Sequence, residues 1–323
     1  MRPLFLRRGG SPDAGMSPIA GRDALMTCLD EIPPALPGWL RAELPFRRRM
    51  VRIDGYRIHF VDQGEGPVVF MLHGNPTWCF LWRKVIPIVA RFGFRVIAPD
   101  LVGLGLSDKP RDPAFHTLGT HIALMTKLVD TLGIEEMTIM GHDWGGPIAA
   151  GVAAAESSRV SRALFANTSL LVPKRPIRTT AFHRFAHIPH LSEFVFQRFN
   201  FPVPVMHFAQ RNRKAWTRIQ RMAYHWPLRN REDRVAPLAL ARMVPSSETH
   251  PSIPHLEKTE AWLRAFQGRL ILLWGKYDPI LGRALHRMQE AAPHAIVQTA
   301  AGGHFLQEEV PEAFGRAVCI LHE

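Results

Sequence analysis

One short stretch of the sequence joins an apolar run to a carboxylate that stands among small residues. Residues 137–146 read MTIMGHDWGG, so Asp143 stands between Gly141 and Gly145, with Gly146 after it. Small residues around a single reactive side chain are typical of a nucleophile elbow, a sharp turn from a strand into a helix where larger side chains would collide with nearby backbone. The tip here carries a carboxylate instead of a serine, so we predict nucleophilic catalysis through an ester of Asp143.

Hydrolysis of an ester needs a general base, and a histidine held by a second carboxylate is the usual solution. Asp278 follows an apolar run at residues 270–274, and His304 follows the last such run at 295–299. The order of nucleophile, acid and histidine along the chain is that of α/β-hydrolases. We therefore predict that Asp143 is the nucleophile, that His304 is the general base, and that Asp278 orients His304.

The elements expected to position these residues alternate between strands and helices. We predict strands at residues 68–72, 95–99, 137–140, 160–167, 270–274 and 295–299. Of these, 68–72 and 95–99 have the apolar character of strands buried on both faces. Patterns that predict helices lie at 80–92, 117–132, 145–155, 259–266, 281–292 and 310–321. Two further β-type runs, 50–54 and 56–61, are joined at Asp54-Gly55 in a predicted hairpin. The alternation predicts an α/β-hydrolase fold with a mostly parallel, doubly wound sheet.

The alternation stops between residues 170 and 245, which are rich in arginine, phenylalanine and proline. We predict that this segment is a helical cap, inserted into a core made of residues 46–169 and 246–323. Such a cap would cover the carboxyl edge of the sheet, where open α/β folds bind their ligands. Residues 1–45 lack clear periodicity and contain a proline cluster, so we predict a partly ordered N-terminal arm.

The formal net charge of +12 is concentrated in the predicted cap, because residues 170–245 contain fourteen lysines or arginines and three acidic residues. No DNA- or RNA-binding motif accompanies this charge, so we expect a solvated basic face and no nucleic-acid partner.

No apolar run approaches the roughly 18 to 20 residues of a membrane span, so we expect no membrane association. The three cysteines, Cys28, Cys79 and Cys319, are too far apart for a disulfide framework or metal spacing, and predict a cytoplasmic protein.

Five segments together resemble the haloalkane dehalogenases, which are α/β-hydrolases with a cap. They are HGNPTWCFLWRKVIP from His73, RVIAPDLVGLGLSDKP from Arg95, GHDWGGPIA from Gly141, WGKYDPILG from Trp274 and GGHFLQEEVPE from Gly302. The resemblance spans about Val51 to the C-terminus and leaves the N-terminal arm unmatched. It implies hydrolysis of a small halogenated alkane by water to an alcohol, a halide and a proton, without a metal or an organic cofactor.

The resemblance also implies a halide-binding pair, Asn75 and Trp144, whose backbone N–H groups would form the oxyanion hole. Amide and indole N–H groups suit a departing halide because they stabilise it without competing as nucleophiles. With Asp278 as the acid, this pair resembles a less common group of the family. Another group has a glutamate after the strand that here ends near Asn167, where this chain offers no carboxylate. A tryptophan of the cap, Trp216 or Trp226, stays an alternative second halide donor.

Two other functions compete with dehalogenation. An epoxide hydrolase shares the Asp–His–Asp machinery but activates the epoxide oxygen with paired tyrosines of the cap, and the predicted cap contains only Tyr224. A non-catalytic protein that binds a partner through its basic cap is the more distant alternative. The sequence predicts neither the preferred haloalkane nor the oligomeric state.

Overall fold

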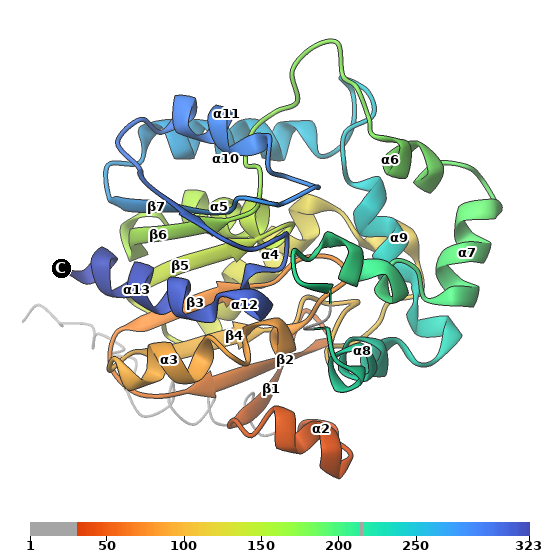
Figure 1. The fold of residues 1–323 in the computed structure, drawn as a ribbon, viewed down its shortest axis with the longest axis horizontal. Coiled ribbons are helices and arrows are strands. Elements are labelled where there is room, and N and C mark those ends of the chain that lie inside the picture. The colour runs from red at the N-terminus through yellow and green to blue at the C-terminus, as the bar shows by residue number, and fades with distance from the viewer. Residues whose placement is uncertain (1–30, 214–215) are drawn as a thin grey trace, which may run out of the picture.

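The computed structural model describes residues 31–213 and 216–323, which form an eight-stranded sheet with helices on both faces (Figure 1). The strand order is β1-β2-β4-β3-β5-β6-β7-β8. The hairpin strands β1 (Arg48–Ile53) and β2 (Tyr56–Gln63) are antiparallel, and β2 pairs antiparallel with β4 (Arg95–Pro99). All other neighbours pair in parallel. The predicted mostly parallel α/β fold is thereby confirmed.

The central parallel strands are buried along most of their length because helices cover both sides of the sheet. They are β3 (Val68–Leu72), β5 (Met137–His142), β6 (Val160–Ala166) and β7 (Arg269–Gly275), with β8 (Ile296–Ala300) at the edge. On one face lie α3 (Ile86–Arg91) and α13 (Pro311–His322), and on the other lie α4 (Leu118–Thr131), α5 (Gly145–Ala155), α10 (Ile253–Ala265) and α11 (Ala284–Ala291) (Figure 1). The strands therefore hold the residues that follow them at one rigid edge.

Two of the predicted helices differ from those in the structure, and a proline explains each difference. The helix expected at residues 80–92 divides into a 3-10 turn, η1 (Cys79–Trp82), and α3. Pro87 stands in the first turn of α3, where its missing N–H is tolerated and its fixed φ suits a helix start. Likewise α10 begins at Ile253, earlier than expected, with Pro254 in its first turn.

The segment between β6 and β7 contains α6 (Ala181–Ala186), α7 (Leu191–Phe199), the 3-10 helix η4 (Val203–Ala209), α8 (Arg218–His225) and α9 (Val235–Arg242). These helices lie at one end of the sheet (Figure 1). A small cluster of aromatic rings, centred on the buried Phe196 and including Phe182, Phe185 and Phe201, packs α6, α7 and α9 together. We use the word cap for residues 170–245, as in the prediction above.

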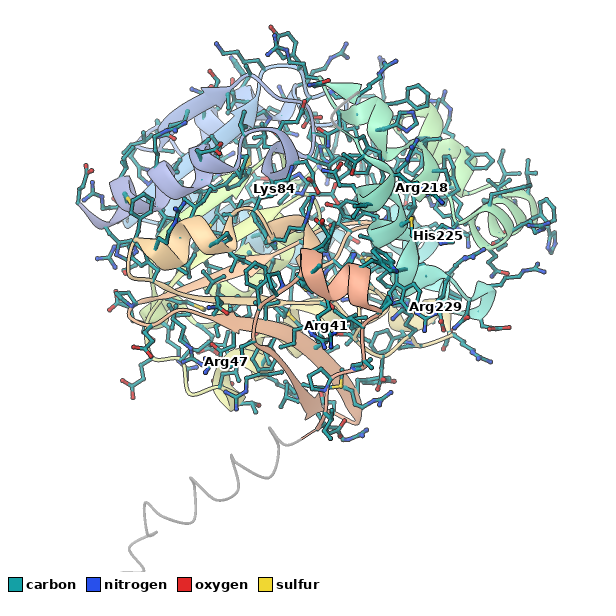
Figure 2. The ribbon with its side chains drawn as sticks, turned by 60° about the horizontal axis from the view of Figure 1, so that its bottom comes forward. Arg41, Arg47, Lys84, Arg218, His225 and Arg229 are labelled. Carbon is teal, nitrogen blue, oxygen red and sulfur yellow. The ribbon has the colours of Figure 1, made fainter. Side chains whose placement is uncertain are left out.

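The predicted N-terminal arm lies mostly outside the described residues. Within the part of it that the structure describes, Gly38–Glu43 form the short helix α2. Figure 2 shows Arg41 of α2 on the same face as Arg218 and His225 of α8 and Arg229. Three of these four labelled side chains are arginines. No helix among the described residues is both long and apolar enough to cross a membrane.

A buried ion-pair network joins the cap to the core at Glu308 of α12 (Leu306–Glu309). Two core cations contact Glu308: Arg83 pairs with both carboxylate oxygens, and Lys84 Nζ lies 3.1 Å from Oε2. From α8 of the cap, the Tyr224 hydroxyl donates to Oε1 at 2.7 Å and the Gln220 amide donates to Oε2 at 2.8 Å. Burial raises the pKa of Glu308, but Arg83 and Lys84 outweigh burial and hold that pKa below its usual range. Glu308 is therefore a charged anchor for α8.

We predict that Glu308→Ala lowers the free energy of unfolding by about 3–5 kcal/mol, because it leaves the buried Arg83 guanidinium without its carboxylate. Urea unfolding at pH 7, followed by circular dichroism, measures this loss. The matched control is Glu257→Ala, which removes an exposed glutamate of α10 and should change the free energy by less than about 0.5 kcal/mol. Equal losses in the two variants would contradict the anchoring role of Glu308.

Candidate active site

Asp143 stands at the tip of a tight turn between β5 and α5. Its φ angle is +51°, a left-handed conformation that non-glycine residues rarely adopt and that only a well-packed surrounding maintains. The turn is tight because backbone approaches backbone: a Cβ atom on Gly145 would lie 2.2 Å from the carbonyl oxygen of Leu72, and one on Gly146 would lie 2.0 Å from Thr168 Oγ1. This packing is the physical reason for the glycines around Asp143.

The structure brings Asp143, His304 and Asp278 together at the carboxyl edge of the sheet. His304 is 1% exposed. Its Nδ1 lies 3.1 Å from Asp278 Oδ2, and its Nε2 lies 3.6 Å from Asp143 Oδ2. The other oxygen of Asp278 accepts backbone N–H bonds from Ile280 at 2.8 Å and Leu281 at 3.1 Å. Asp278 is thus fixed in the loop after β7, and it holds the His304 ring toward Asp143.

The charges of these three residues depend on one another. Burial lowers the pKa of His304, but the Asp278 and Asp143 carboxylates outweigh burial and raise it to about 9. Burial raises the pKa of Asp143 and of Asp278, but in each case the bond to His304 and its charge outweigh burial and lower the pKa. At neutral pH the site therefore contains an imidazolium between two carboxylates.

The two oxygens of Asp143 have different surroundings. Oδ1 accepts the backbone N–H of Asn75 at 2.8 Å. The backbone N–H of Trp144 also bonds the Asp143 carboxylate and lowers its pKa. Oδ2 is the oxygen nearest to His304. Oδ1 is therefore held by a backbone N–H donor, and Oδ2 faces His304.

The side chains of Asn75 and Trp144 line the same cavity as Asp143 and His304. The amide Nδ2 of Asn75 donates to the carbonyl oxygen of Pro237 in α9 at 2.9 Å. An amide group carries two N–H donors, so one remains for a ligand. Among the described residues the indole N–H of Trp144 has no hydrogen-bond partner. These two donors beside a carboxylate can bind a small anion that forms at the reacting carbon.

The cavity has a volume of about 640 Å³, within the range usual for small-molecule sites. Its walls are mostly apolar and come from both the core and the cap, with Leu171, Phe201, Met206, Leu256 and Ile280 among them. Its reactive groups are gathered at the elbow. An apolar chamber over a carboxylate suits an uncharged, apolar ligand.

The cap aromatics considered as alternative donors are directed elsewhere. Neither Trp216 nor Trp226 lines the cavity. The Trp216 ring stacks on Tyr224 with centroids 5.2 Å apart, and Trp226 packs edge-on against Trp39 at 5.9 Å. The Tyr224 hydroxyl donates to the buried Glu308, so it does not face the nucleophile. The three rings serve packing and anchoring of the cap.

Asn167 organises the site, although it was noted in the sequence only as a position without a carboxylate. Its Nδ2 donates to the carbonyl oxygens of Gly303 at 2.9 Å and His304 at 2.7 Å, and its Oδ1 accepts the N–H of Gly275 at 2.8 Å. His142 supports the same loop, because its Nε2 donates to the His304 carbonyl at 2.9 Å. A polar residue directly after a buried strand was the available signal for Asn167.

Comparison with known proteins gives a consistent set of relatives. The chain matches the alpha/beta hydrolase fold family over residues 67–311. It is 32% identical over 260 residues to a haloalkane dehalogenase of Mycobacterium marinum, across 78% of this chain and 84% of that protein. It is 28% identical over 276 residues to a cis-3-alkyl-4-alkyloxetan-2-one decarboxylase of Shewanella oneidensis, across 83% and 86%. The crystal structure of the haloalkane dehalogenase DatA from Agrobacterium tumefaciens C58 matches with a TM-score of 0.76 at 25% identity, across 85% and 96%.

We predict that Asn167→Ala loosens the loop that carries His304. The Gly303 carbonyl and the Gly275 N–H lose their partner, at about 1–3 kcal/mol each, and the His304 carbonyl keeps only His142. Hydrogen exchange measured by mass spectrometry should become faster in the peptide over residues 301–306 and stay unchanged in β3. Asn230→Ala, which removes an exposed asparagine of the cap, is the control and should leave both peptides as they are. Unchanged exchange at 301–306 would show that Asn167 does not hold this loop.

Proposed function

Because the chain belongs to the haloalkane dehalogenases of the alpha/beta-hydrolase fold, we propose that Asp143 displaces halide from a haloalkane and forms a covalent alkyl ester. Water then hydrolyses this ester to an alcohol, with His304 as the general base. The observation that carries the proposal is that the two oxygens of the Asp143 carboxylate have different partners. Oδ1 is bound by the Asn75 N–H, whereas Oδ2 faces His304.

In the first step Asp143 Oδ2 attacks the carbon that bears the halogen, and the carbon–halogen bond breaks with its electron pair on the halide. The lowered pKa of Asp143 keeps its carboxylate ionised at neutral pH. The departing halide gains hydrogen bonds from the free N–H of the Asn75 amide and from the indole N–H of Trp144. Neither donor is a nucleophile that competes with the carboxylate.

In the second step water attacks the carbonyl carbon of the ester, and His304 Nε2 takes a proton from it. Negative charge then develops on Oδ1, where the backbone N–H of Asn75 stabilises it, with the Trp144 N–H proposed as the second donor. The bond between the carboxyl carbon and the ester oxygen then breaks. The alkoxide takes one of the two protons of the water and leaves as the alcohol, and the other proton remains on His304. Esterification also prepares His304 for this work. It removes the charge on Asp143 that helps to raise the His304 pKa to about 9, so the histidine becomes a neutral base more readily. Asp278 stabilises the imidazolium that re-forms.

The structure disfavours the competing functions. An epoxide hydrolase needs cap hydroxyls near the nucleophile, and the single tyrosine of the cap, Tyr224, bonds Glu308 instead. A non-catalytic binding protein would have no need of the Asp–His–Asp cluster inside a cavity. The similarity to an oxetan-2-one decarboxylase supports a second candidate substrate, a β-lactone, because the same carboxylate can attack a strained ring.

The proposed partners are thus a halogenated alkane, water and the released halide. The described cysteines Cys79 and Cys319 are free thiols. Unpaired thiols suit a reducing compartment, which supports the cytoplasmic location expected from the sequence.

We predict that bromide is released from short bromoalkanes by the wild-type protein and that Asp143→Asn abolishes this release. His304→Phe should release one bromide per protein and then stop, because the ester forms but finds no base. Intact-protein mass spectrometry should detect the alkyl group, and peptide mapping should locate it on Asp143. His225→Phe, a histidine of α8 outside the cavity, is the control and should turn over normally.

An unmodified Asp143 in His304→Phe, after incubation with an accepted substrate, would refute the covalent mechanism. Release of carbon dioxide from an oxetan-2-one, without bromide release from any haloalkane, would favour the second candidate instead.

The two steps should respond differently to pH. Asp143 stays ionised across the neutral range, so we predict that the single-turnover rate of bromide release is constant between about pH 6 and 9. Hydrolysis of the ester needs neutral His304. The pKa of His304 in the ester intermediate lies below 9, and the hydrolysis rate should fall about tenfold for each pH unit below that pKa. Rapid-quench measurement of bromide and alcohol tests this. Parallel pH profiles for both products would contradict it.

A further inference from the structure

We propose that the enzyme prefers haloalkanes that carry an uncharged hydrogen-bonding group, such as a hydroxyl or an ether oxygen, and that His183 of the cap binds this group. The inference rests on the proposed function, because it concerns the substrate of the same cavity. It assigns a task to a residue that the dehalogenation steps do not use.

The cap side of the cavity contains one polar spot. Among the described cap residues, 170–213 and 216–245, fourteen line the cavity, and only Thr180 and His183 have side chains that form ordinary hydrogen bonds. The others are apolar, with Phe182, Phe201 and Met206 among them. A polar group in an otherwise apolar wall fixes the orientation of a ligand, because the ligand must either satisfy that group or leave it without a partner.

The start of α6 holds the His183 ring in a defined position. Thr180 is the N-cap of this helix, and its hydroxyl accepts the backbone N–H of His183 at 3.4 Å. The same hydroxyl lies 2.8 Å from His183 Nδ1. The ring of Phe182 flanks the imidazole, with centroids 5.1 Å apart. Nδ1 is therefore occupied, whereas Nε2 has no hydrogen-bond partner among the described residues and remains for a ligand.

The charge state of His183 selects the kind of ligand. Burial lowers the pKa of His183, and the opposing effect of the Asp143 carboxylate does not overcome burial. At neutral pH the imidazole is therefore uncharged and forms a hydrogen bond without a strong ionic attraction. The carboxylate of Asp143 lines the same cavity and repels anions. Both effects favour a neutral oxygen over a carboxylate at the remote end of the substrate.

The test uses three substrates of equal chain length. 1-Bromohexane has an apolar end, 6-bromohexan-1-ol has a neutral hydroxyl, and 6-bromohexanoate has a charged carboxylate. We expect the wild-type enzyme to have a lower KM for the bromoalcohol than for 6-bromohexanoate. His183→Leu should raise KM for the bromoalcohol about tenfold, the effect of one hydrogen bond, and change KM for 1-bromohexane less than about twofold. His183→Gln keeps a hydrogen-bonding group, so its KM for the bromoalcohol should lie between the values of the wild type and of His183→Leu.

The matched control is Val205→Ala, which changes the shape of the same wall without removing a polar group. It should shift KM for 1-bromohexane and for the bromoalcohol by the same factor. If His183→Leu also shifts both substrates equally, His183 only fills space and the inference fails while dehalogenation stands. If a folded wild-type protein releases bromide from none of the three substrates, the proposed function fails and the inference fails with it.

Discussion

His304 lies buried between the carboxylates of Asp143 and Asp278, and the fold around it keeps these three charges together. An imidazolium in this environment is stable only while both carboxylates stay close, which is why its pKa rises to about 9 despite complete burial. Asp278 is fixed by two backbone N–H groups, and Asp143 by the turn at φ +51°. The loop that carries His304 is tied to β6 and β7 through Asn167. Each of the three charges thus depends on backbone geometry from a different strand.

The cap takes part in the same arrangement through two contacts of different kinds. Glu308 binds α8 with a charged network that is almost fully buried. Asn75 binds α9 through one amide bond to the carbonyl of Pro237. The first contact fixes where the cap sits on the core. The second orients a side chain whose other N–H group is proposed to bind halide. The docking of the cap therefore both forms part of the apolar cavity wall and orients an amide that is proposed to bind halide.

The placement of Asp143, Asp278 and His304 at one edge of the sheet was predictable from sequence because their signals are local. Glycines surround Asp143, and Asp278 and His304 each follow a segment that is predicted as a strand. The fold was predictable from the alternation of predicted strands and helices along the chain. The contacts of Asn167, Tyr224 and Asn75 were not predictable, because each joins residues more than 80 positions apart. His183 was one of sixteen histidines, and only the cavity wall distinguishes it.

In the proposed mechanism, the bond from Asn75 to the Pro237 carbonyl makes halide binding depend on a main-chain atom of the cap. A carbonyl oxygen cannot be mutated, but the path of α9 can change through any side chain that packs beneath it. A substitution under α9 would therefore alter halide binding without touching the halide itself.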